Sequence, residues 1–181
     1  MSELSLGTLS GLAANSYVID VAAGSQLTQP GMVLQVVSTT KTDTFSTTST
    51  SLTDITGLSA SITPATTASQ VLVTVSIPFG HSSSNNNVFT ITDGSDTILV
   101  NPGSPGSRTA SFMARGFTGV AGMGTVSFSF LHSPATASSF TYKIRCLTAS
   151  GTLYVNRSDS DSDLSQFGRG IATITLMEVA G

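Results

Sequence analysis

Charged residues are scarce in this chain, and their scarcity excludes several classes of protein. Only 9% of the 181 residues are charged, whereas an average soluble domain carries about 25%. The seven Lys and Arg residues are scattered and the net charge is −3, so the basic surface of a nucleic-acid-binding protein is missing. Surface charge normally keeps proteins apart in solution. Here we expect serine and threonine hydroxyls to keep the surface hydrated instead.

Cysteine pairs, a secretory signal and long apolar runs are also lacking. The chain has one cysteine, Cys146, which excludes an intramolecular disulfide, and its alternating surroundings predict a small buried side chain rather than a reactive thiol. The N-terminus shows no signal-peptide pattern, and no apolar run approaches the ~20 residues of a membrane-spanning helix. We therefore expect a protein made in a cytoplasm that reaches the exterior within a particle, with no membrane span and no nucleic-acid partner.

What the chain does contain is a two-residue alternation of apolar and hydroxyl side chains. The clearest runs lie at 70–77, 125–131, 140–147 and 171–179. Turn signals separate short runs of this kind, and no stretch shows the 3.6-residue period of a helix. Small β-branched side chains suit strands. The pattern predicts an all-β protein, an antiparallel jelly-roll sandwich of about ten strands, whose last strand pairs in the middle of a sheet.

The first 30 residues differ from the rest. Leucines at positions 4, 6, 9 and 12 (Leu4, Leu6, Leu9, Leu12) interrupt a serine- and glycine-rich stretch, and a turn signal closes the segment at Pro30. We predict that residues 1–30 form an N-terminal docking arm or connector and that residues 31–181 form the β-knob. A simple first strand of the same domain is the alternative for the arm.

Several blocks in residues 31–181 resemble a β-rich domain common in tailed phages, especially those of marine and freshwater bacteria. The blocks are Val33-Leu34-Gln35-Val36-Val37, Lys41-Thr42-Asp43-Thr44-Phe45-Ser46, Leu52 to Pro64, Tyr142-Lys143, Asn156-Arg157-Ser158, Gly168-Arg169 and Ile174-Thr175-Leu176-Met177-Glu178-Val179. Such domains occur at the tips of tail fibres and as small separate virion proteins, including cyanophage-like ones.

The resemblance implies a knob similar to the trimeric heads of tumour necrosis factor and complement proteins, displayed on a virion. It implies a non-enzymatic structural protein without cofactors, a homotrimer that joins other virion proteins through its arm and contacts a host glycan or protein. A capsid decoration protein that grips the shell through residues 1–30 is the alternative. A carbohydrate-binding module is a third, more distant one.

Two histidines are the candidates for acid–base chemistry, His81 and His132. A catalytic triad needs a base and an orienting acid beside the nucleophile. The chain has no Gly-x-Ser-x-Gly nucleophile motif; Gly103-Ser104-Pro105-Gly106-Ser107 comes closest and lacks its spacing. We therefore do not expect an enzyme.

Three alternating aspartates, Asp159, Asp161 and Asp163, are the only candidates for a metal site. Carboxylates at this spacing suit calcium. However, Leu164 and Gly170 stand where a calcium loop carries glycine and glutamate. The alternative is an acidic turn that pairs with the nearby arginines at 157 and 169, and no metal is expected.

The polar segment 81–87 is the candidate surface loop for a ligand, through His81, Asn85, Asn86 and Asn87. Neutral amides and hydroxyls suit a sugar, and Phe89 or Phe117 could provide a stacking platform in a chain without tryptophan. A larger apolar set exceeds what one thin sandwich needs, and we expect it to line either a subunit interface or the core. Its members are Phe112, Met113, Phe117, Met123, Phe128 and Phe130.

Overall fold

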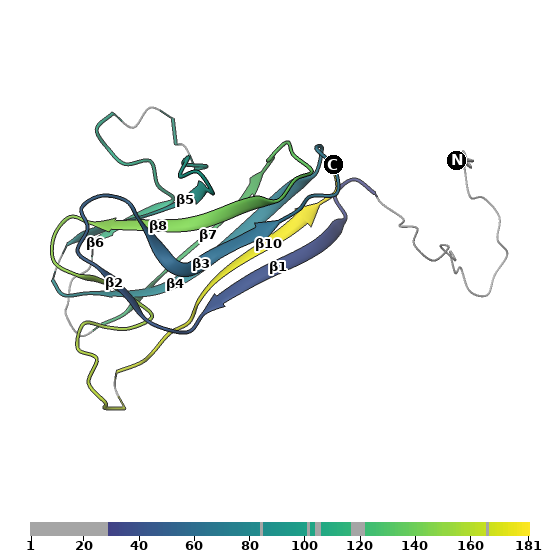
Figure 1. Ribbon diagram of the computed structural model, residues 1–181. Coiled ribbons are helices and arrows are strands. Elements are labelled where there is room, and N and C mark those ends of the chain that lie inside the picture. The colour runs from purple at the N-terminus through teal and green to yellow at the C-terminus, as the bar shows by residue number, and fades with distance from the viewer. Residues whose placement is uncertain (1–28, 84, 101, 104–105, 117–121, 166) are drawn as a thin grey trace, which may run out of the picture.

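A computed structural model describes residues 29–181, except 84, 101, 104–105, 117–121 and 166. This part of the chain forms strands joined by turns (Figure 1). The strands are β1 (Val33–Lys41), β2 (Phe45–Thr47), β3 (Thr53–Ile62), β4 (Gln70–His81), β5 (Asn86–Asp93), β6 (Met113–Gly116), β7 (Gly124–His132), β8 (Phe140–Thr148), β9 (Leu153–Val155) and β10 (Ala172–Val179). The predicted arm leucines at 4, 6, 9 and 12 lie outside the described residues.

The strand pairing is that of a jelly roll. Apart from the short β2 and β9, the strands pair from the outside of the sequence inward: β1 with β10, β3 with β8, β4 with β7, and β5 with β6. Alternate pairs then join into two sheets, because β10 also pairs with β4 and β8 also pairs with β5. All of these pairings are antiparallel, and the predicted fold class is confirmed.

The core lies between the two sheets and follows from the alternation in the sequence. In β4 the side chains of Val71, Val73, Val75 and Ile77 are buried, while the residues between them point outward and are half-buried. The four-stranded sheet contributes inward side chains such as Ile144. The last strand, β10, lies between β1 and β4 as predicted, which places its alternate side chains in the centre of the core.

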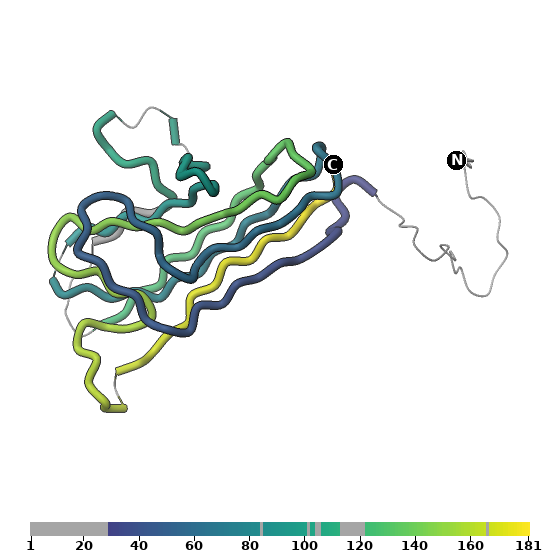
Figure 2. Tube along the Cα trace, in the orientation of Figure 1, coloured from purple at the N-terminus to yellow at the C-terminus, as the bar shows by residue number. Residues whose placement is uncertain are grey.

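The described chain enters and ends at the same end of the sandwich (Figures 1 and 2). The N–H of Gly31 donates to the carbonyl of Ala180, and the N–H of Ala180 donates to the carbonyl of Met32, both at 2.8 Å. The loops after β1, β4, β8 and β9 lie at the opposite end (Figure 2). A knob held at its N-terminal end would therefore present these loops outward.

The segment 97–100 pairs back along β5 for only a short distance. It makes one isolated bridge, between Thr92 and Ile98, and the N–H of Leu99 donates to the carbonyl of Ile91 at 3.0 Å. In the turn before this segment, the carboxylate of Asp93 accepts hydrogen bonds from the N–H groups of Ser95 and Thr97, both at 2.8 Å. The edge of β5 is instead taken by β6, a strand that the sequence pattern did not reveal.

Candidate subunit interface

The outer face that β1, β10, β4 and β7 form in the larger sheet carries no charged side chain. Strand register aligns its outward side chains in three rows that cross β1, β10, β4 and β7 in that order. The first row is apolar, Val36, Met177, Leu72 and Leu131; the second is Ser38, Thr175, Thr74 and Ser129; the third is Thr40, Thr173, Ser76 and Ser127. We call these twelve residues the uncharged face. Val36 and Leu131, at the two ends of the apolar row, are 57% and 49% exposed.

The hydroxyls of this face bond to one another. Ser38 and Thr175 share a hydrogen bond of 3.0 Å between their side-chain oxygens, and Thr74 and Ser129 share one of 3.1 Å. Such internal pairing partly replaces the hydrogen bonds to water. Removing these groups from water therefore costs less than removing unpaired hydroxyls.

Charge gathers instead on the outer face of the smaller sheet. Lys143 and Arg145 of β8 both pair with Asp54 of β3, at 3.1 and 2.8 Å, and both also pair with Asp96 in the turn after β5. The hydrogen bond from Lys143 lowers the pKa of Asp96, and the same bond raises the pKa of Lys143. The two faces of the sandwich therefore differ: one is a network of ions, and the other is neutral.

The charged residues of the larger sheet point away from its outer face. Lys41 is buried at the end of β1, and its ammonium lies 2.6 Å from the carboxylate of Asp43. Glu178 is also buried and accepts hydrogen bonds from the Gln35 amide at 2.6 Å and from the Ala65 N–H at 2.7 Å. Burial alone would raise the pKa of Glu178, but these bonds and one from Ser69 lower it below its ordinary value.

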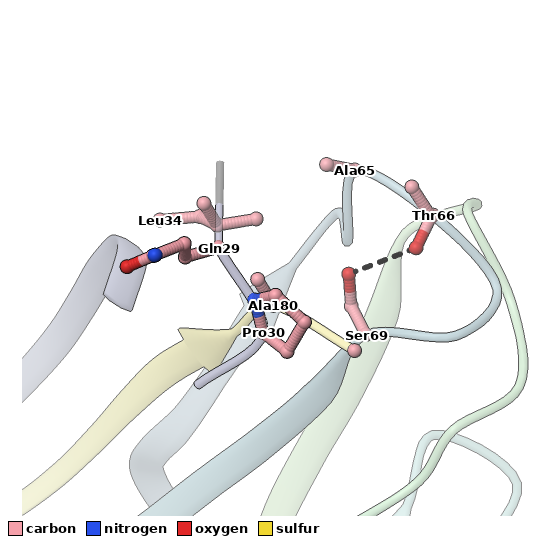
Figure 3. A pocket seen from close by; sticks show the side chains of 8 residues that line it. Gln29, Pro30, Leu34, Ala65, Thr66, Ser69 and Ala180 are labelled. Atoms are coloured by element: carbon pink, nitrogen blue, oxygen red, sulfur yellow. Dashed lines mark hydrogen bonds between the residues drawn. The ribbon is translucent and has the colours of Figure 1, made fainter. Parts of the chain in front are cut away.

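A small hollow of about 120 Å³ opens near Glu178, where the described chain begins (Figure 3). Its walls come from three segments, represented by Pro30, Thr66 and Ala180, and Thr66 and Ser69 share a hydrogen bond of 3.2 Å at its rim. No charged side chain lines the hollow among the described residues. It therefore offers a bound molecule little beyond its shape and a few neutral polar groups.

The segment 81–87, predicted to be a surface loop, is only partly exposed. His81 ends β4 and is buried, and Asn87 is buried within β5, so their predicted surface positions are wrong. Asn86 is exposed, and Asn85 is half-buried and donates to the Ser150 hydroxyl at 2.5 Å. Phe89 is also fully buried and contacts Phe79, with ring centroids 5.3 Å apart, so it offers no platform for a sugar. Phe117 lies outside the described residues.

His81 belongs to a hydrogen-bonded network between loops. Its Nδ1 lies 2.6 Å from the carbonyl oxygen of Ser83 and 3.0 Å from the backbone nitrogen of the same residue. Its Nε2 lies 2.8 Å from the Thr148 hydroxyl oxygen, and that hydroxyl donates to the carbonyl of Ser150 at 2.8 Å. These contacts tie the His81 ring to the loops that follow β4 and β8. His132 bonds instead to the hydroxyl of Tyr142. In the described part of the chain, neither ring has a carboxylate hydrogen bond that would orient it as a catalytic base.

The central aspartate of the predicted calcium triad is engaged by arginines. The carboxylate of Asp161 lies 3.1 Å from Arg157 and receives two bonds from Arg169, at 2.7 and 2.5 Å. This is the pairing expected of an acidic turn. Within the described ranges, no three His, Cys, Asp or Glu side chains gather into a group that could hold a metal, and no helix there is long and apolar enough to span a membrane.

Cys146 and the aromatic residues differ in burial. Cys146 is fully buried, and burial raises the pKa of its thiol to about 12, as expected of a small core residue. Phe112, Phe128 and Phe130 pack against the core but remain half-buried. Met123 is also half-buried, and nothing is described for the side chains at 113 and 117. The sequence pattern did not reveal the uncharged face, although the alternating hydroxyls at 127–129 and 173–175 carry its signal.

No family model and no curated protein matches the chain. Solved structures that share some similarity come from infectious bursal disease virus. The Gx strain structure has a TM-score of 0.41 and 14% identity, and the match covers 87% of this chain and 41% of that one. The T13 particle structure has a TM-score of 0.43 and 15% identity, and the match covers 90% of this chain and 40% of that one. A mutant VP2 protein in derived T=1 particles has a TM-score of 0.42 and 12% identity, and the match covers 92% of this chain and 45% of that one. The chain thus spans less than half of these proteins, and similarity at this level carries no argument about function.

Proposed function

We propose that this protein is a non-enzymatic structural protein on a virion surface, a homotrimeric knob displayed on a tail or fibre for host contact. The observation that carries the proposal is the uncharged face. A free monomer gains nothing from a neutral sheet face crossed by an apolar row, since such patches favour association. In an assembly the same face is useful, because no charge has to be stripped of water when copies meet.

The polarity of the sandwich supports attachment through its N-terminal end. The described chain enters beside Ala180 at one end, and the loops that follow β4, β8 and β9 lie at the other end. Residues 1–30, anchored in other virion proteins, would leave these distal loops free. Host contact would then fall on exposed groups such as Asn86, and on the loop that Asp161 and its two arginines brace.

Capsid decoration is the alternative role for the same assembly, with the arm gripping the shell. Deleting residues 2–28 in the virus separates the two roles. Particles that lose heat stability indicate decoration, whereas stable particles that no longer adsorb to cells indicate host contact. A carbohydrate-binding module finds less support, because Phe89, one of its two proposed platforms, lies in the core.

Two measurements test the common proposal. Mass photometry of the purified full chain should give the mass of three copies, and gold-labelled antibodies should mark the surface of intact virions. A chain that stays monomeric at micromolar concentration, or virions without label, would contradict it. As a matched pair, Thr74→Arg on the uncharged face should abolish the trimer, and Thr141→Arg on the charged face should not. Both threonines are half-buried and hydrogen-bond a serine on the neighbouring strand.

A further inference from the structure

Strand β7 forms a corner of the sandwich. Among the described strands it pairs only with β4, so it is an edge of the larger sheet. Its outward residues, including Leu131, belong to the uncharged face. Its other row points between the sheets, and in this row Val126 is fully buried whereas Phe128, Phe130 and His132 are only half-buried. Inward residues of β4 such as Val73 have no exposed surface, so the sandwich is less completely closed along β7 than in its centre.

The half-buried rings form a continuous row at this corner. Phe112 stacks on Phe128 with centroids 5.1 Å apart, Phe128 is 5.6 Å from Phe130, and Phe130 is 6.1 Å from His132. The row continues to Phe140, 5.4 Å from His132. We call these five residues the aromatic edge. Because these rings are still partly in contact with water, covering them in a contact would contribute further hydrophobic free energy.

The apolar row of the uncharged face and the β7 part of the aromatic edge are similar in length, and both are apolar. The apolar row of the face crosses three strand spacings of about 4.8 Å, or about 14 Å. Phe128 to His132 span four residues of β7 at about 3.3 Å each, or about 13 Å. A row of rings can therefore lie along a row of aliphatic side chains of nearly equal length. Within the uncharged face and the aromatic edge, His132 is the one residue with an ionisable side chain of the acidic or basic kind.

We propose that the aromatic edge of one copy packs against the uncharged face of the next copy, an inference that rests on the self-assembly in the proposed function. Face-to-face pairing would leave the rings of both copies in water, whereas edge-to-face packing covers both surfaces. The two surfaces differ, so the contact is heterologous, and repeated contacts of this kind close into a ring when the rotation allows. A homotrimer is such a ring, and its charged outer sheets would remain in solvent.

Cysteine cross-linking tests this arrangement. Thr74→Cys marks the face, Phe130→Cys marks the edge, and Thr141→Cys on the opposite sheet is the matched control. The native Cys146 is buried and should not react. When each pair is co-expressed and treated with a short bifunctional maleimide, we expect covalent dimers from Thr74→Cys with Phe130→Cys. We expect none from Thr74→Cys alone or from Thr141→Cys with Phe130→Cys.

The outcomes separate the inference from the proposed function. Cross-linking of Thr74→Cys to itself would show face-to-face pairing and overturn the inference while leaving self-assembly intact. Assembled protein whose face and edge do not cross-link would overturn it as well. A wild-type chain that stays monomeric would overturn both. Because removing a ring can weaken the fold, each variant is first checked by thermal melting, and Phe140→Cys replaces Phe130→Cys if the latter does not fold.

Discussion

Nδ1 of His132 and the hydroxyl of Tyr142 share a hydrogen bond of 2.9 Å, and the two rings meet edge to face with centroids 5.6 Å apart. Burial raises the pKa of Tyr142, so the phenol keeps its hydrogen. Burial also lowers the pKa of His132, against the opposing effect of the Asp93 carboxylate. The hydrogen bond therefore joins a neutral histidine to a protonated, buried phenol at the aromatic edge.

Acid should destabilise the protein through His132. Its folded-state pKa is lowered, so the unfolded chain binds the proton more readily, and stability falls as the pH drops below the unfolded value of about 6.5. His132→Phe removes this titration. Between pH 7 and pH 5, we expect the melting temperature of the wild type to fall more steeply than that of the variant. Parallel curves for the two proteins would contradict the assignment.

Glu178 should control stability in a lower pH range. Its pKa is lowered by hydrogen bonds from Gln35, Ser69 and Ala65 that outweigh burial, so its contribution is complete above the unfolded value of about 4.3 and is lost as the pH falls through the folded value. Glu178→Gln replaces one carboxylate oxygen by an NH₂ group, which cannot accept the hydrogen bonds that Gln35, Ser69 and Ala65 donate there. We expect a loss of about 1–3 kcal/mol at pH 7, measured by urea unfolding. A loss that does not shrink as the pH is lowered toward 3 would argue against the carboxylate as its source.

A side chain at Gly80 should damage the fold. A Cβ there would lie 2.6 Å from the carbonyl oxygen of Arg157 and 2.8 Å from the Cα of Ser158, both backbone atoms that cannot move aside alone. We expect Gly80→Ala to cost about 1–3 kcal/mol. Gly168→Ala is the control, because a Cβ at that position meets nothing within 4 Å. Equal melting temperatures for the two variants would contradict this, because they would show that the backbone at Arg157 and Ser158 moves away from position 80 at little cost.

Cys146 should be inert until the protein unfolds. Its thiol is fully buried and its pKa is raised to about 12, so almost no thiolate exists at pH 8. We expect no reaction with a coloured disulfide reagent in the native protein and one reacted thiol per chain in denaturant. Rapid reaction of the native protein would reveal opening of β8, the strand that carries Cys146.

The alternation of apolar and hydroxyl residues was enough to predict strands, their approximate number and the fold class. The run at 70–77, for example, became the central strand β4 because a period of two puts Val71, Val73 and Val75 on one side of any strand. The failures were local. His81 looked like a loop residue because serines and asparagines follow it, yet Thr148, 67 positions away, supplies the hydrogen bond that lets it be buried.

The sequence by itself determined that this chain is a β-sandwich with few charges and a buried cysteine, since composition and periodicity act residue by residue. Tertiary structure alone decided where the charges lie. Strand register aligned Ser38, Thr175, Thr74 and Ser129 into one neutral row, although the first two are 137 positions apart. It also gathered Lys143, Arg145, Asp54 and Asp96 on the opposite sheet. The physical reason is that the composition of a sheet face depends on which strands pair and in which register, and no single segment of the sequence specifies this long-range pairing.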